Sequence, residues 1–168
     1  FTELMSIEGK TLKIPSGGGI TFSGDPNSRR NSPSVNSRTL DDYEEGSGNV
    51  SVTMSGGGSV GIGPATSGYK YIKIGKIVHF SFEFQTTSVS SPSGTMQVAL
   101  PFTIRSGMYY AGSVRLYNET FSGSPFIAAM SGGTVIEFRT NQSGSVNGDI
   151  TPTAGTRYHF GSITYECA

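Results

Sequence analysis

The stretch KIVHFSFEFQ, residues 76–85, constrains the fold of this chain more than any other. Val78, Phe80, Phe82 and Phe84 recur at every second position, and the residues between them are mostly polar. Successive side chains of a β-strand point to opposite faces, so a period of two is typical of a half-buried strand. We therefore predict a strand here whose four large apolar side chains lie in the core.

The segments around this strand also read as strands. GYKYIKIG, residues 68–75, precedes it, and Gly75–Lys76 at the junction predicts a tight turn that makes the two strands antiparallel neighbours. NVSVTMS, residues 49–55, places Val50, Val52 and Met54 on one face. Further strand candidates, separated by turns rich in Gly, Ser, Pro and Asn, are residues 95–102, 111–117, 125–131, 134–140 and 158–166.

This succession of short strands, with 24 glycines and no helical periodicity, predicts an all-β protein. The spacing favours an antiparallel β-sandwich or jelly-roll-like head over residues 46–168. Residues 1–45 have no long hydrophobic alternation and are predicted to form an extended N-terminal arm or linker. Within the arm, KTLKI and GITFS could be short strands that pair with a neighbour. The chain begins with Phe, so we expect it to be part of something longer.

Composition argues against several classes of partner. The formal net charge is zero, so no basic surplus attracts nucleic acid, and no apolar run is long enough to insert into a membrane. Cys167 is the single cysteine, which excludes an intrachain disulfide and a cysteine-based zinc site.

Catalytic chemistry is not indicated. His79 and His159 are the two histidines, and we predict that both are strand residues facing solvent or a subunit interface. No G-x-S-x-G elbow is present, and the glycine runs at 16–19 and 55–63 lack the Gly-Lys-Ser/Thr ending of a phosphate-binding loop. We interpret both runs as loops, and we expect no catalytic residues, no cofactor and no enzyme activity.

Four acidic residues fall within five positions of RTLDDYEEGSG, residues 38–48: Asp41, Asp42, Glu44 and Glu45. They lack the alternating spacing and the distal bidentate Glu of a calcium loop, and a carboxylate pair for glycoside hydrolysis would need a structured cleft. The segment is therefore expected to bind no metal and to be solvated or paired with arginine.

Together these motifs resemble a known family. TLDDYEEGSG, followed by SGYKYIKIGKIVHFSFEFQTTSVSSPSGTMQVALPF, is similar to the C-terminal domain of bacteriophage tail fibre and tailspike proteins, with its L-D-D-Y-E-E-G segment, G-x-Y-x-K-I-G hairpin and later L-P-F. The preceding GGGITFSGD also resembles the family's linker strand. The family commonly has T-W-T-P after the acidic segment, whereas GSGNVSVTM follows here and the chain has no Trp.

The resemblance implies that residues 40–46 join arm and head, and that residues 71–75 belong to the first large hairpin. It also implies a homotrimeric virion appendage, facing the outside, that binds a bacterial surface receptor such as a glycan or protein during host attachment. One alternative is a purely structural trimerisation or assembly cap of a longer fibre or spike. Another is a eukaryotic trimeric jelly roll of the C1q or tumour-necrosis-factor type, which shares the architecture without the acidic junction.

A glycan site needs flat side chains beside amide or hydroxyl groups. Few segments combine them in Gly-flanked loops, so we predict ligand contacts from Tyr109, Tyr110, Tyr117, Asn118 and Phe121. Tyr109 and Tyr110 are adjacent, so one of them is expected to point into the core. The alternative is the loop TTSVSSPSG, residues 86–94.

Overall fold

The structure consists of two units, and the strands of the first, N-terminal unit are short and pair with one another. The structure is a computed structural model that describes residues 6–8, 11–13, 20–21, 39–40, 43–63, 67–141, 148–153 and 155–168. It divides into two compact units, Phe1–Tyr43 and Glu44–Ala168. In the first unit, β1 (Ser6–Glu8) pairs with β2 (Thr11–Lys13), and β3 (Ile20–Thr21) pairs with β4 (Thr39–Leu40), both antiparallel.

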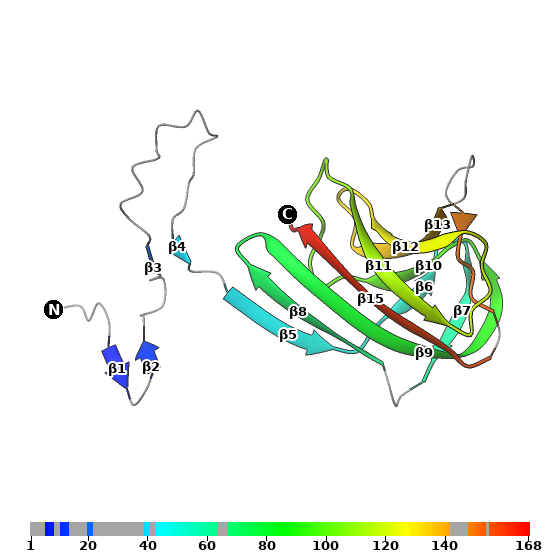
Figure 1. Cartoon of the computed structure of the whole chain (residues 1–168), viewed down its shortest axis with the longest axis horizontal. Coiled ribbons are helices and arrows are strands. Elements are labelled where there is room, and N and C mark those ends of the chain that lie inside the picture. The colour runs from blue at the N-terminus through cyan, green and yellow to red at the C-terminus, as the bar shows by residue number, and fades with distance from the viewer. Residues whose placement is uncertain are drawn as a thin grey trace. The chain divides into compact units, whose positions relative to one another are not determined.

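The second unit is built around one antiparallel sheet (Figure 1). Its strands are β5 (Tyr43–Gly48), β6 (Val52–Met54), β7 (Gly57–Ile62), β8 (Gly68–Ile74), β9 (Ile77–Ser93), β10 (Met96–Ala99), β11 (Tyr110–Tyr117), β12 (Ser124–Ala129), β13 (Val135–Asn141), β14 (Gly148–Asp149) and β15 (Arg157–Glu166). The order is β5-β8-β9-β15-β11-β12-β13-β10-β6, with β7 also on β9 and β14 on β13. The described part of the chain contains no helix, so the all-β, antiparallel prediction is confirmed.

The first half of β9 forms the centre of the core. Val78, Phe80, Phe82 and Phe84 are buried, and Ile77 and His79 on the opposite face are exposed, which confirms the alternation predicted from the sequence. β8 pairs with β9 through the predicted turn, where Gly75 has a φ of 58°. A positive φ is favourable for Gly and costly for most other residues, so this glycine determines where the hairpin turns.

β9 continues well beyond its predicted end. The segment interpreted as a possible loop, residues 86–94, is strand as far as Ser93, and its partner is β7. The glycine run 55–63, predicted to be a loop, supplies β7, whereas the run 16–19 lies outside the described residues. A Cβ on Gly58 would lie 2.3 Å from the Ser91 carbonyl oxygen, so a side chain at this position would prevent the close approach of the two strands.

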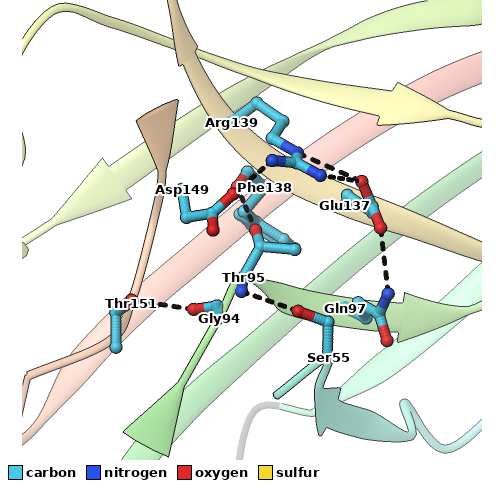
Figure 2. Close-up of polar contacts among 9 residues, drawn as sticks. All are labelled: Ser55, Gly94, Thr95, Gln97, Glu137, Phe138, Arg139, Asp149 and Thr151. Carbon is cyan, nitrogen blue, oxygen red and sulfur yellow. Dashed lines mark hydrogen bonds and ion pairs between the residues drawn. The ribbon is translucent and has the colours of Figure 1, made fainter. Parts of the chain in front are cut away.

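The chain bends sharply at two adjacent places, between β6 and β7 and between β9 and β10. The bend separates the β7–β9 pairing from the β6–β10 pairing. Gly57, Gly58 and Gly94 have positive φ at this bend. Thr95 donates its backbone N–H to Ser55 Oγ at 2.9 Å and its hydroxyl to the Phe138 carbonyl oxygen at 2.5 Å (Figure 2). These bonds join β6, β10 and β13 at the bend.

Beside the bend lies a second set of polar contacts (Figure 2). Gln97 donates to Glu137 Oε1 at 3.0 Å, and the Arg139 guanidinium contacts both Glu137 and Asp149. Thr151 donates to the Gly94 carbonyl oxygen at 2.8 Å. Because these groups satisfy one another, we assign this cluster a structural role.

The sheet curls so that its two halves face each other across the core, as a half-barrel. The Phe138 ring on β13 packs edge-on against Phe82 and Phe84 on β9, with centroids 5.8 and 6.0 Å apart. β11 belongs to both halves, because it pairs with β12 through Tyr110–Gly112 and with β15 through Ser113–Tyr117. The jelly-roll connectivity and the trimer are still predictions.

Candidate functional site

The strands β5, β8, β9, β15 and β11 present one face to the core and the other to solvent; we call the second the outer face. The pairing register sets which side chains lie side by side on it. Arg115, Phe160 and Glu83 are opposite one another on β11, β15 and β9, and Ser162, Ser81 and Lys70 form the next row on β15, β9 and β8. Neighbouring strands are about 4.8 Å apart, so residues distant in sequence become near neighbours here.

An open hollow of about 580 Å³ lies on this face, and we call it the Phe160 hollow. Its polar and aromatic lining comprises Ser47, Asn49, Lys70, Ser81, Glu83 and Phe160. Gly68 has no side chain to fill the hollow, and Gly48, Tyr69 and Phe82 complete its lining. Its volume falls within the range of small-molecule sites.

A second hollow of about 520 Å³ continues from the first and is lined by Glu45, Ile72 and His79 among others. The two share Ser47, Lys70 and Ser81, so together they make one groove across β5, β8 and β9. His79 Nδ1 lies 3.0 Å from Thr164 Oγ1 at the margin of this groove.

Aromatic rings border the Phe160 hollow on its β11 side. Phe160 is 36% exposed, and the Arg115 guanidinium lies over its ring at 5.8 Å from the centroid. The rings of Tyr117 and Tyr158, directly opposite each other on β11 and β15, have centroids 6.0 Å apart. Gln85 donates to the Tyr158 hydroxyl at 3.3 Å. The outer face therefore carries three neighbouring rings, which we call the aromatic strip: Phe160 and Tyr158 on β15, and Tyr117 on β11.

The residues predicted to bind a ligand fall into two groups at opposite ends of β11. Tyr117, Asn118 and Phe121 lie at its C-terminal end, and Tyr117 is 51% exposed and belongs to the aromatic strip. Tyr109, 68% exposed, and Tyr110 lie at the other end, roughly 23 Å away along the strand. Tyr110 packs edge-on against Tyr165 and so points inward, as expected for one of the two. Their contact with a ligand is still a prediction.

His159 does not face solvent or an interface, which corrects the sequence interpretation. It is fully buried, and its ring stacks on Phe84 with centroids 4.5 Å apart and planes 8° apart. His159 is an even number of residues from Ile163 and Tyr165 in β15, so its side chain points to the same, core-facing side of the sheet. Burial disfavours the charged imidazolium and lowers the pKa of His159 to about 4, an effect that the nearby Phe84 backbone only partly offsets. His79, by contrast, is exposed as predicted.

The acidic segment is only partly within the described residues, since Asp41 and Asp42 lie outside them. Glu44 accepts a hydrogen bond from the Tyr71 hydroxyl, and this bond is the main reason that the pKa of Tyr71 is raised. Across the described ranges, no three His, Cys, Asp or Glu side chains are placed to hold a metal ion. The same ranges contain no helix long and apolar enough to cross a membrane.

The sequence reasoning missed the hollow and its ring, Phe160. A signal was available in RYHFGSITYE: Phe160 and Tyr158 are large aromatic residues on the face that also carries Ser162, Thr164 and Glu166. Among the described residues, Lys70 and Glu83 form no hydrogen bond or ion pair through their side chains. Both are exposed and therefore available to a ligand.

The fold is similar to that of a solved tailspike. No family model and no curated protein matches this chain. The crystal structure of Dettilon tailspike protein superposes with a TM-score of 0.60 at 17% sequence identity. The match covers 73% of this chain and 24% of the tailspike chain. This likeness concerns the fold, and the specific L-D-D-Y-E-E-G domain type is still a prediction.

Proposed function

We propose that this chain is a head domain of a bacteriophage tail fibre or tailspike, exposed on the virion, that binds a bacterial surface glycan during host attachment. The observation that carries the proposal is the groove on the outer face. It combines an exposed ring with hydroxyl, amide, ammonium and carboxylate groups, which is the chemistry that a glycan requires. The shared fold with a tailspike supports the same assignment.

The proposal includes a homotrimer with jelly-roll-like heads and no enzyme activity. A curled sheet whose described strands end at β5 gains stability when symmetric copies cover its edges and exposed apolar side chains. Ile74 and Ile77 lie opposite each other on the outer face and are about half exposed, so they are available for such a contact.

The alternative is a structural cap that trimerises a longer fibre or spike without binding a receptor. The exposed isoleucines favour this second function, whereas the polar groove does not. An array of purified bacterial surface polysaccharides, probed with the fluorescently labelled chain, distinguishes the two. We expect saturable binding to a few polysaccharides. A trimer that binds none of them would support the cap and refute the receptor-binding role.

A further inference from the structure

The Phe160 hollow is built from side chains with complementary roles. Phe160 offers a flat apolar surface whose position is fixed by β15 and by Arg115 over its ring. Lys70 can donate hydrogen bonds, Glu83 can accept them, and Ser81 between them can do both. Such a set suits a ligand that has one apolar ring face and hydroxyl groups around its rim.

The dimensions agree with one sugar ring. Phe160 and Lys70 are two strands and two residues apart, roughly 12 Å between their backbone positions, and Glu83 is directly opposite Phe160 on the strand between them. A pyranose stacked on Phe160 therefore has its edge toward Glu83, Ser81 and Lys70. Gly68, which pairs with Glu83, leaves room for the ring because no side chain extends from this position.

The charges of the hollow favour a neutral sugar. Lys70 would attract a carboxylate group on the ligand, but Glu83 would repel it within the same small space. A hydroxyl group can donate to Glu83 and accept from Lys70 without this conflict. Hydrogen bonds to charged groups are also stronger than those between neutral groups.

We propose that the Phe160 hollow is a subsite for one neutral pyranose of a glycan, stacked on Phe160 with its hydroxyl groups bound by Lys70, Ser81 and Glu83. This inference rests on the proposed function and names its site. The other two rings of the aromatic strip, Tyr158 and Tyr117, lie beside the hollow and provide the surface for the next sugar.

The test is NMR titration of the isotope-labelled chain with neutral methyl glycosides of glucose, galactose, mannose, rhamnose and N-acetylglucosamine, and with methyl glucuronide. We expect saturable millimolar binding of at least one neutral glycoside, with shift changes centred on Lys70, Ser81, Glu83 and Phe160. No saturable binding, a preference for the glucuronide, or shift changes confined to another surface would overturn the proposal.

Variants make the assignment specific. Phe160→Ala should weaken binding of the neutral glycoside at least tenfold, and Lys70→Ala about fivefold to tenfold. Glu83→Gln should weaken the neutral glycoside and strengthen the glucuronide. Met130→Ala and Lys76→Ala, exposed residues away from the hollow, are the matched controls and should bind as the wild type.

Each variant is first checked for an unchanged melting temperature, and Phe160→Leu replaces Phe160→Ala if the latter does not fold. Phe160 variants that fold and bind like the wild type refute the subsite. If the polysaccharide array is positive while these variants bind normally, the receptor-binding function stands and the Phe160 hollow is not its site.

Discussion

Replacement of Phe82 by Ala should be among the most destabilising single changes in the head. Phe82 is 5% exposed, and its ring packs against Phe80, Phe84 and Phe138 at centroid distances of 5.8 to 5.9 Å. These neighbours are held by two facing parts of the curled sheet, so they cannot move in to fill the space. We expect a loss of about 3–5 kcal/mol in the free energy of unfolding, typical of a buried Phe→Ala change.

Urea unfolding at equal protomer concentration measures this loss, and the melting temperature should fall by roughly 10 °C or more. His79→Ala, on the outer face of the same strand, is the matched control and should change stability by less than about 1 kcal/mol. If the two variants lose similar stability, or if Phe82→Ala loses less than about 1 kcal/mol, the packing around β9 described here is wrong.

Four further predictions concern the buried histidine, a close-packed glycine, the acidic segment and the oligomer. The pKa of His159 is lowered to about 4 in the folded chain, so between about pH 6.5 and pH 4 the unfolded chain binds a proton that the folded chain does not. The free energy of unfolding, measured with urea, should therefore decline by up to roughly 3 kcal/mol as pH falls through this window. An equal decline in the His159→Phe variant would exclude His159 as the cause. Gly161→Ala should cost about 1–3 kcal/mol, because the new Cβ would lie 2.5 Å from Phe82 Cζ, whereas a wild-type melting curve would show that the ring has room to shift. The thermal transition should be unaffected by calcium or EDTA, and an increase of many degrees with calcium would reveal a metal site in the acidic segment. Light scattering after gel filtration should give the mass of three chains, and the mass of one chain would contradict the trimer.

The sequence predicts a strand well where one face is buried and the other is solvated. In the first half of β9 the apolar residues alternate strictly, so both the strand and its buried face could be derived from residues 76–85. The second half is polar on both faces and pairs with a glycine-rich strand, so neither partner has the alternation that would identify it. Turn-forming residues at 55–58 and 91–94 mark a bend within paired strands, and from sequence they resemble loops.

The outer-face site could not be predicted because it depends on register. Its residues come from β5, β8, β9 and β15, and they become neighbours only when the strand order and pairing are known. Residues close in sequence, such as Tyr109 and Tyr117, were easier to group, yet the length of β11 separates them. His159 illustrates the same point. Its burial is determined by its position in β15, where side chains alternate and it shares the core-facing side with Ile163 and Tyr165, rather than by its residue type.

Attachment to bacterial cells tests the central claim most directly. The labelled chain is incubated with a panel of bacterial strains, before and after mild periodate oxidation, which cleaves vicinal diols in surface glycans. We expect wild-type binding to some strains, its loss after periodate treatment, and at least tenfold weaker binding by Phe160→Ala, equivalent to about 1.4 kcal/mol. Binding that survives periodate treatment, or no binding to any strain, would contradict a glycan-binding head.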